Sequence, residues 1–566
     1  MKKLLRYLKD YRKESVLGPL FKLLEATLEL FVPLVVAAII DTGIGNQDRS
    51  YVVKMCFVLV LFGIIGLAFS ITAQYFAAKA AVGFVTKIRH VLFAHIQKLS
   101  YAELDTQGTS TLITRMTSDM NQVQNGVNLT LRLLLRSPFV VIGAMIMAFT
   151  IDVKAAMIFV VAIILLSIVV FGVMFITKPL YKKVQSGLDT ILGTTRENLT
   201  GVRVIRAFHQ EQAEYNKFLA ENEELTSLQK FAGKISGLTN PLTFIIINFA
   251  ILVLIHTGAV RVSLGTLSQG QVVALYNYMS QILVELIKLA NLIISVTKAM
   301  ACFNRIQDVF HIEPSMKEGT KTVAAAGNTT PAVEFKNVSF TYAGGGDHAV
   351  ENISFKAMPG QTIGIIGGTG SGKSTLVNLI PRFYDVSEGE VDIAGKNIQD
   401  YTYGSLRNTI SVVPQKAQLF AGTIRDNLTF GCPDATEEQI EEALAISQAK
   451  EFVDTKEGRL DAKIEQGGKN LSGGQRQRLT LARALVPQSD ILIMDDSASA
   501  LDYATDARLR KAIQDMKRKP TVFIVSQRTS SIQNADMILV LDDGKIAGQG
   551  THEQLLKSCN IYREIY

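Results

Sequence analysis

The stretch TIGIIGGTGSGKST at residues 362–375 decides the fold of the second half of the chain. A short, apolar, β-branched run leads directly into a Gly-x4-Gly-Lys-Ser pattern. This order is typical of a strand that continues through a phosphate-binding loop into a helix. The glycines let backbone N–H groups approach an anionic phosphate closely. The residues predicted to bind a nucleotide here are Gly367, Gly368, Thr369, Gly370, Ser371, Gly372, Lys373, Ser374 and Thr375.

Two side chains of this loop and one carboxylate downstream predict a nucleotide–magnesium site. Lys373 can neutralise the β- and γ-phosphates, and the Ser374 hydroxyl can ligate Mg²⁺. The apolar run Ile491–Met494 ends at Asp495, where a carboxylate can hold Mg²⁺ opposite the phosphate loop. Without the loop, this run would predict only a buried strand that meets a solvated aspartate. Together the motifs predict ATP and Mg²⁺ as cofactors.

The region around these motifs has the pattern of an α/β domain. Short, apolar and β-branched runs alternate with helical segments, which is typical of a largely parallel sheet. The five runs are Ala332–Phe335, Thr362–Ile366, Ile491–Met494, Thr521–Val525 and Met537–Leu541.

The first half of the chain has the composition of a membrane protein. Of the 566 residues, 48% are hydrophobic and 19% are charged. This composition indicates that a large share of the chain lies in lipid and not in water. The predicted fold is therefore an α-helical membrane domain with six spans and long cytoplasmic extensions, followed by an α/β phosphate-loop domain. The six stretches long enough to cross a bilayer are Val16–Ile40, Val52–Tyr75, Leu131–Thr150, Ala155–Ile176, Leu242–Val262 and Val272–Ile294.

The charge pattern predicts which ends of the spans face the cytoplasm. The long polar helical stretches Thr86–Asn128 and Tyr181–Lys234 carry most of the loop basic residues, and the other connections are short. Basic residues concentrate on the cytoplasmic side, so we expect the long loops and both termini there, in a multi-pass protein of the cell membrane. Part of the net charge of +7 directly precedes the first apolar stretch, which disfavours nucleic acid as a partner.

A polar stretch at residues 307–331, containing AAAGN at 324–328, is typical of a linker. We therefore expect a membrane domain at residues 1–310, a linker at 311–331 and a nucleotide-binding domain at 332–566. The first apolar stretch lacks a small-residue cleavage site, so we expect no cleavable signal peptide. The four cysteines form no CxxC pair and indicate neither a disulfide framework nor zinc: Cys56, Cys302, Cys432 and Cys559.

Residues 471–478 read LSGGQRQR, and this stretch resembles the signature sequence of the ABC transporter family. The resemblance extends to further motifs in the same order. Tyr342 matches the aromatic residue that stacks on adenine, and Gln415 matches the glutamine of the Q-loop at the Mg²⁺ site. Asp502, in the run SALD at residues 499–502, matches the D-loop aspartate.

The resemblance implies a dimer with shared sites. In the family, the nest formed by the signature contacts the γ-phosphate held by a different nucleotide-binding domain. A chain with one such domain therefore cannot close either site, and the working unit would sandwich two ATP molecules between two half-transporters. The signature residues are Ser472, Gly473, Gly474 and Gln475.

Six spans and a nucleotide-binding domain in one polypeptide resemble the exporter arrangement of this family. The segments Ser100–Asp105 and Gly201–Gln212 resemble its coupling segments, which end the long cytoplasmic loops and touch the nucleotide-binding domains.

The sequence departs from the family pattern at two catalytic positions. Asp496 follows Asp495 where the family usually has glutamate, so the carboxylate that activates water is one methylene short. A retraction of about an ångström can cost on the order of a hundredfold in rate. Gln527 replaces the switch histidine and cannot carry charge or shuttle a proton. The loop EQGG at residues 465–468 also lacks the consecutive glutamate–arginine pair that the family often has there.

These departures leave two interpretations open. Neutral drift within a functional homodimer is one. The other is a division of labour, because the chain resembles the half of heterodimeric bacterial multidrug exporters whose own phosphate loop lies in a degenerate site. The intact signature would then serve the competent site of a partner that is a different chain.

Charged residues inside the spans are costly and suggest a function. In the first span, Lys22, Glu25 and Glu29 recur on one face, and two acids sharing one lysine either form a structural pair or face a cationic substrate. In the sixth span, Glu285 and Lys288 favour an internal ion pair. Interhelical hydrogen bonds are expected for His256, Asn277 and Gln281.

Three classes of function remain open on the sequence: an exporter, an importer on the same membrane fold, and an ATP-gated channel. The exporter is favoured, as an ATP hydrolase coupled to transport. The membrane domain is apolar and has few charges. We therefore expect its transported substrate to be an amphiphilic drug, a lipid or a hydrophobic peptide. We expect no processing domain before the first span, which argues against a peptide-maturing exporter.

Overall fold

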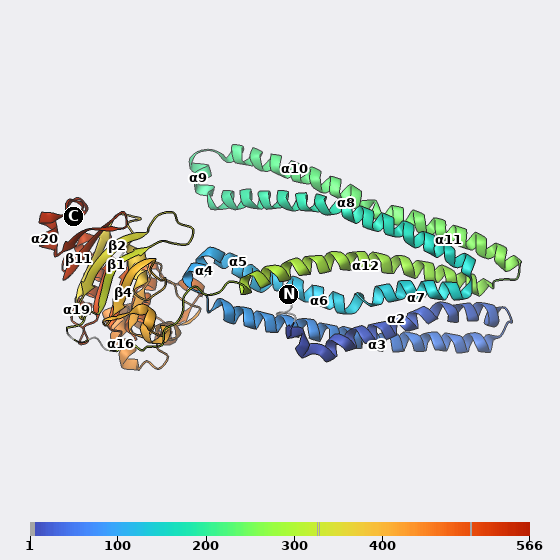
Figure 1. The fold of residues 1–566 in the computed structure, drawn as a ribbon, viewed down its shortest axis with the longest axis horizontal. Coiled ribbons are helices and arrows are strands. Elements are labelled where there is room, and N and C mark those ends of the chain that lie inside the picture. The colour runs from blue at the N-terminus through green and yellow to red at the C-terminus, as the bar shows by residue number, and fades with distance from the viewer. Residues whose placement is uncertain (1–5, 325–326, 328, 498–500) are drawn as a thin grey trace. The chain divides into compact units, whose positions relative to one another are not determined.

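The computed structural model describes residues 6–324, 327, 329–497 and 501–566 (Figure 1). It divides into two compact units, residues 1–97 with 110–311 and residues 98–109 with 312–566. The short segment at residues 98–109 thus belongs with the C-terminal unit although it lies inside the helical half of the sequence. Of the predicted linker, Ala325, Ala326 and Asn328 lie outside the described residues.

The first unit is a bundle of long helices. Six helices of the described chain are long and apolar enough to cross a membrane, which confirms the six predicted spans. Their segments are α2 (Arg12–Ala38), α3 (Arg49–Ile96), α5 to α7 (Thr109–Thr114, Met120–Leu133 and Arg136–Ile151), α8 (Val153–Thr200), α10 and α11 (Glu211–Gly237 and Thr239–Ser263) and α12 (Gln269–Phe310).

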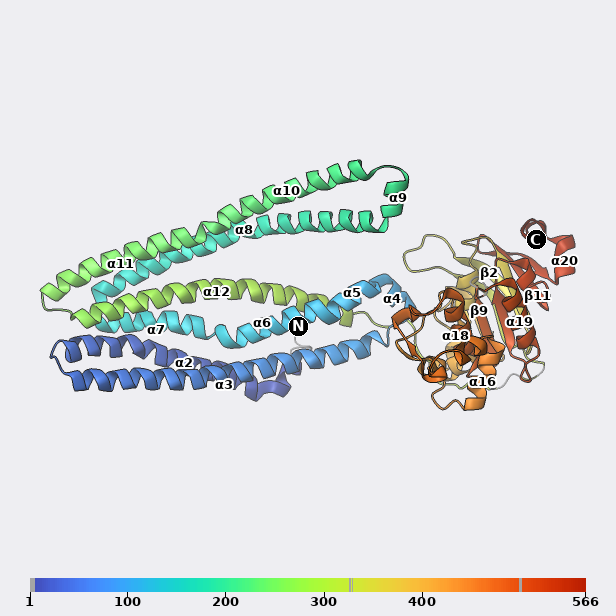
Figure 2. The same ribbon diagram turned by 180° about the vertical axis from the view of Figure 1, so that it is seen from behind.

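Helices α3 and α8 are much longer than a bilayer is thick. Each has 48 residues, which corresponds to about 70 Å at 1.5 Å per residue against about 30 Å of hydrocarbon. The views in Figures 1 and 2 agree that α8 runs beside α10 and α11 over most of this length. The predicted polar extensions of the spans are therefore helical.

The predicted helical stretch Thr86–Asn128 is interrupted, however. Helix α3 ends at Ile96, and α4 (Tyr101–Gln107) begins with Ser100 and Glu103 in a capping box. Gly108, at φ 73°, then ends α4 in the left-handed region that favours glycine. These local signals turn the chain into a separate short helix.

The three short connections place polar caps at the helix starts. Asp48 accepts a hydrogen bond from the Tyr51 N–H at the start of α3, and Asp152 accepts one from the Ala155 N–H at the start of α8. Ser268 does the same for the Gln271 N–H of α12. The caps satisfy backbone donors that the first turn of a helix leaves without partners, at one end of the bundle.

The second unit contains a six-stranded sheet in the order β12-β11-β3-β10-β9-β6. All neighbouring strands from β11 to β6 are parallel, and only β12 is antiparallel to its neighbour. The strands are β3 (Thr362–Gly367), β6 (Ile410–Val413), β9 (Ile491–Asp495), β10 (Thr521–Val525), β11 (Met537–Asp542) and β12 (Lys545–Gly550).

One of the five predicted strands lies in a different sheet. Ala332–Phe335 falls mostly in β1 (Val333–Phe340), which pairs antiparallel with β2 (Val350–Ala357) and β4 (Glu388–Ile393). The assignment of this run to the parallel sheet is wrong, because β1 and β2 are joined by a short connection, which favours antiparallel pairing. Phe355 joins the two sheets by packing its ring against Phe523 of β10.

Candidate functional site

The predicted nucleotide residues gather at the carboxyl ends of four adjacent parallel strands. The phosphate loop follows β3, Gln527 lies two residues after β10, Asp495 ends β9, and Gln415 lies two residues after β6. Because the order β3-β10-β9-β6 is continuous and parallel, these segments share one edge of the sheet. The structure therefore brings together motifs that are far apart in the chain.

The phosphate loop is shaped by backbone constraints that only glycine meets. Gly372 lies at φ 90°, and a Cβ there would come within 2.5 Å of the Ala349 carbonyl oxygen. Lys373 begins the following helix α13 (Lys373–Leu379), and its Nζ donates to the Gly367 carbonyl at 2.9 Å and to the Gly368 carbonyl. The ammonium group thus lies across the loop in which the phosphates would sit.

Two oxygen groups suited to Mg²⁺ face each other beside this loop. The Ser374 hydroxyl donates to Asp495 Oδ1 at 3.0 Å, and Asp495 is buried. Burial raises the pKa of Asp495, as does the neighbouring Asp496, whereas the Ser374 hydrogen bond opposes the shift. A hydroxyl and a carboxylate at this separation fit the hard oxygen ligands that Mg²⁺ requires, so Ser374 and Asp495 would hold the ion when it binds.

Burial also lowers the pKa of Lys373, and the charge of Asp495 opposes that shift. A buried ammonium beside the phosphate loop needs anions around it. Nucleotide phosphates would supply them, which agrees with the predicted role of this lysine.

Asp496 and Gln527 occupy the positions where catalysis is expected. Asp496 has φ 44°, and its backbone N–H donates to the Val525 carbonyl of β10 at 3.0 Å. Gln527 is exposed two residues beyond Val525, and Gln415 is exposed beyond β6. The backbone of Asp496 is therefore held against the neighbouring strand, and only its side chain can reach toward a water molecule. The catalytic roles of these residues stay predictions.

Tyr342 is fixed beside the phosphate-loop helix by contacts with other aromatic residues. Its hydroxyl lies 3.0 Å from Thr375 Oγ1, and its ring meets Phe340 and Tyr384 edge-on, with centroids 4.9 and 5.4 Å away. The residue is still 37% exposed. An exposed aromatic ring held against Thr375, at the start of the helix that follows the phosphate loop, is suited to stack on a base.

The signature residues open helix α18 (Gly473–Leu485) with an intact cap. Ser472 accepts a hydrogen bond from the Gln475 N–H at 3.2 Å, and Gln475 accepts one from the Ser472 N–H at 3.0 Å. Ser472 and Gly473 are exposed, and Gly474 is half-buried. The nest is thus formed and open to solvent within this chain, where a second subunit could present a nucleotide.

Asp502 caps helix α19 (Tyr503–Gln514) through the Thr505 N–H at 3.1 Å, and hydrogen bonds from Thr505 lower the pKa of Asp502. Ser499 and Ala500 of the predicted D-loop lie outside the described residues.

Helix α4 contacts the nucleotide-binding fold beside the adenine-stacking position. The Tyr101 ring lies 4.7 Å from that of Phe383, and the Tyr384 hydroxyl donates to Asp105 Oδ2 at 2.6 Å. Tyr384 also touches the Tyr342 ring. The predicted coupling segment Ser100–Asp105 is therefore connected to the adenine site through one tyrosine, which the motif analysis did not identify.

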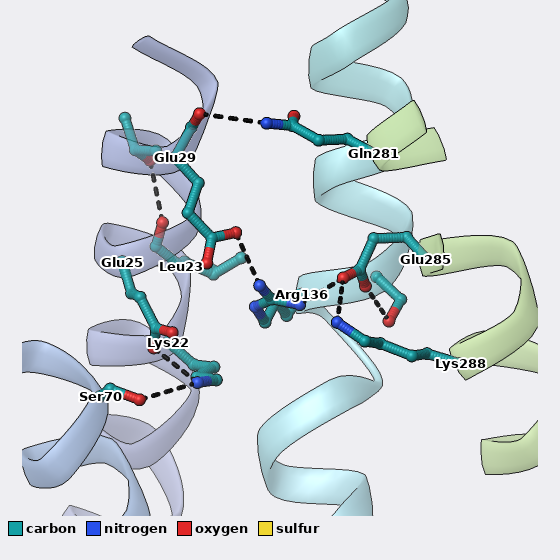
Figure 3. Close-up of polar contacts among 11 residues, drawn as sticks. Lys22, Leu23, Glu25, Glu29, Ser70, Arg136, Gln281, Glu285 and Lys288 are labelled. Carbon is teal, nitrogen blue, oxygen red and sulfur yellow. Dashed lines mark hydrogen bonds and ion pairs between the residues drawn. The ribbon is translucent and has the colours of Figure 1, made fainter. Parts of the chain in front are cut away.

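The intramembrane charges form a balanced set of two ion-paired groups, one around Arg136 and one of Lys22 with Glu25 (Figure 3). Arg136 of α7 donates to Glu29 of α2 and to Glu285 of α12, each at 2.6 Å. Lys288 pairs with Glu285 at 2.8 Å, which confirms the predicted internal ion pair of the sixth span. Lys22 pairs with Glu25 at 2.6 Å. The set therefore contains three cations and three carboxylates.

Arg136 removes the reason to assign an excess of acid to the first span. The pairing could not be predicted from neighbouring residues, because Arg136 lies in α7, more than a hundred residues from Glu29 in the chain. An arginine inside a predicted span was the available signal. Gln281 lies 3.5 Å from the Glu29 carbonyl oxygen, consistent with an interhelical bond, whereas exposed His256 lines a cavity at one end of the bundle.

A phosphate-loop α/β domain in one chain with six membrane-crossing helices defines an ATPase coupled to transmembrane transport. Residues 15–286 match the family described as the ABC transporter transmembrane region, and residues 350–499 match the family described as ABC transporter. The chain belongs to the ABC transporter family and has the exporter-type half-transporter arrangement, in which the membrane and ATP-binding regions are fused.

The relatives match over nearly the full chain. An uncharacterized ABC transporter ATP-binding protein of Mycobacterium tuberculosis is 35% identical, covering 99% of this chain and 96% of the relative. One of Bacillus subtilis is also 35% identical, covering 100% and 98%. The ATP-dependent lipid A-core flippase of Escherichia coli is 30% identical, covering 96% and 93%.

The structure of a bacterial Atm1-family ABC exporter with ATP bound has the same fold. It superposes with a TM-score of 0.80 over 98% of this chain and 97% of the other, at 22% identity.

We predict that Tyr342→Ala weakens ATP binding by about 1–3 kcal/mol, because a base loses its stacking partner. Tyr342→Phe should bind ATP nearly as well as the unmodified chain, since it keeps the ring and loses only the contact with Thr375. Equilibrium titration with ATP measures both. Unchanged affinity in the alanine variant would reject the assignment.

We also predict that Arg136→Gln destabilises the membrane unit far more than Lys288→Gln. Arg136 and Glu285 are buried, and breaking a buried pair costs about 3–5 kcal/mol. Lys288 has a side chain 43% exposed, so its removal should cost less than about 1 kcal/mol. Thermal unfolding of the purified full chain compares the two. Adding Glu285→Gln to Arg136→Gln should restore part of the loss, and equal destabilisation by the two single variants would contradict the network.

Proposed function

We propose that the chain is the degenerate-site subunit of a heterodimeric exporter. It would move amphiphilic or hydrophobic substrates such as drugs, lipids or peptides out of the cytoplasm, with its nucleotide-binding domain and both termini cytoplasmic. One observation carries the proposal: the signature is intact and open at Ser472, whereas Asp496 and Gln527 stand in place of the usual catalytic glutamate and histidine.

The backbone geometry at Asp496 supports a weak site. The Asp496 N–H is bonded to the Val525 carbonyl at 3.0 Å, so the backbone cannot advance to offset the missing methylene without breaking a bond to β10. A general base must lie within hydrogen-bond reach of the water that it activates. Gln527 can donate a hydrogen bond to a γ-phosphate but offers no proton relay. The site would therefore bind ATP and hydrolyse it slowly.

Binding and hydrolysis would then be divided between two composite sites. In the degenerate site, Lys373 would contact the phosphates, Ser374 and Asp495 would hold Mg²⁺, and Tyr342 would stack on adenine. Mg²⁺ would neutralise charge on the phosphates there. In the competent site, Ser472 and the N–H groups of Gly473 and Gly474 would contact the γ-phosphate bound by the partner chain.

Three observations support an amphiphilic substrate. Glu25, Glu29 and Glu285 are each paired with a cation of the same chain, so they leave no excess acid for a small cation to recognise. A cavity of about 450 Å³ between α8 and α11 is lined only by apolar residues, Met157, Val161 and Phe249 among them. The similarity to a lipid A-core flippase points to the same class of substrate.

The assignment of sites predicts an asymmetry between two variants of this chain. In the complex with its partner, Ser472→Arg should lower ATP hydrolysis by about two or more orders of magnitude, because the competent site loses preorganised donors. Asp496→Asn should change turnover only modestly, since that carboxylate is already too short. ATPase rate and retained nucleotide after one turnover measure the difference, with Lys373→Ala as the control for binding.

The opposite pattern, with Asp496→Asn inactive and Ser472→Arg near normal, would reverse the assignment. Robust hydrolysis by the chain expressed without a partner would instead establish a homodimer. In both cases membership of the ABC transporter family would be unaffected.

The contact between Tyr384 and Asp105 predicts a separation of hydrolysis from transport. Tyr384→Phe removes a hydrogen bond to a carboxylate, which contributes about 1.5–3 kcal/mol, so transport per ATP hydrolysed should fall by about tenfold. Tyr401→Phe is the matched control, because its hydroxyl donates to the Ile393 carbonyl at 2.8 Å, away from α4. Reconstituted vesicles report both rates. An unchanged ratio in Tyr384→Phe would show that this bond does not couple the two.

A further inference from the structure

A basic cavity lies at the end of the bundle that carries the short connections. Its volume is about 490 Å³, and it lies between the start of α8 and the end of α11 with the connection that follows. Its polar lining groups are Lys154, His256, Thr257, Arg261 and Thr266. None of the lining residues is acidic.

The acid that pairs with a lining residue has both of its carboxylate oxygens engaged. Asp152 pairs with Arg261 at 2.7 Å through Oδ2, and its Oδ1 accepts the Ala155 N–H at the start of α8 at 2.7 Å. Its side chain is only 10% exposed. Within the described residues, Lys154 and His256 have no ion-pair partner. The cavity therefore keeps a positive charge that the chain does not neutralise.

Arg261 also has an unsatisfied donor. Its Nε is buried and has no hydrogen-bond partner among the described residues. Leaving such a donor unpaired is costly, and guanidinium groups match the paired oxygens of phosphate better than any other side chain does. An anionic oxygen ligand would satisfy both the donor and the excess charge.

The surroundings of the cavity are those of a lipid-facing surface. Leu264 and Val260 line it and are 71% and 46% exposed, and Val153 and Met157 at the start of α8 are 61% and 53% exposed. A ligand held here would have its polar group beside cations and its remainder against apolar side chains. A phospholipid has both a polar headgroup and apolar acyl chains. A free phosphate ion has no apolar part that could contact these side chains.

A lysine at a helix end commonly extends to the headgroup region without forming a site. This cavity differs in two respects, because Lys154, Arg261 and an imidazole converge on one hollow and because a guanidinium donor is buried there without a partner. Basic residues are also less common at the non-cytoplasmic ends of spans, where the proposed orientation places this cavity.

We propose that this cavity binds the phosphate headgroup of an acidic phospholipid from the adjoining leaflet. Lys154 and Arg261 contact the phosphate oxygens, His256 and Thr257 offer further hydrogen bonds, and the acyl chains lie along Val260 and Leu264.

The test is lipid retention by the purified full chain, measured by native mass spectrometry with phosphatidylglycerol and phosphatidylcholine of identical acyl chains. The unmodified chain should retain phosphatidylglycerol several-fold in excess. The double variant Lys154→Gln with His256→Gln should lower that excess by about fivefold, which corresponds to one cation near a lipid surface. Arg261→Lys keeps the charge but loses the Nε donor and should also lower it.

Lys54→Gln is the matched control, because Lys54 is an exposed lysine near the start of α3 at the same end of the bundle. It should leave the excess unchanged, and a thermal unfolding midpoint equal to that of the unmodified chain confirms the folding of every variant. Equal retention of the two lipids, an unchanged excess in the double variant, or an equal loss in Lys54→Gln would each overturn the proposal. Displacement of phosphatidylglycerol by millimolar inorganic phosphate would overturn it too, in favour of a free-anion site.

Discussion

The hydrogen bond between Ser374 and Asp495 joins two motifs that lie 121 residues apart, and the nucleotide site depends on it. It forms because β3 and β9 both pair with β10 in parallel, so the loop after one strand and the acid at the end of the other meet at the same edge. Lys373, Gln527 and Gln415 occupy that edge for the same reason. The sheet order thus provides the site, and the motifs provide its chemistry.

The membrane unit depends on a comparable constraint. Charged side chains inside a bilayer need partners, and Arg136 supplies them to Glu29 and Glu285 from a third helix. The Tyr278 hydroxyl adds a bond to the Leu30 carbonyl at 2.6 Å, which further ties α12 to α2. The paired charges of α2, α7 and α12 therefore connect these three helices inside the bundle.

Most of the site could be predicted because its motifs are local in sequence. The phosphate loop, the signature and the acid after a buried strand each place their chemistry within a few residues of the chain. The long polar stretches were predicted to be helical, and α8 and α10 confirm this, although the short helix α9 (Val202–Ala207) separates them. The break before α4 was missed because a capping box at Ser100 and a left-handed Gly108 outweigh the helical pattern around them.

The sequence alone determined the six spans, the phosphate loop, and the departures at Asp496 and Gln527. Each of these features depends only on residues that follow one another in the chain. The tertiary structure decided the partners: Arg136 for Glu29, Asp105 for Tyr384, and the antiparallel sheet for the run at Ala332–Phe335. It also decided that Lys154 and Arg261 line one hollow. These pairings join residues tens to hundreds of positions apart, and only the packing of helices and strands brings such residues within contact distance.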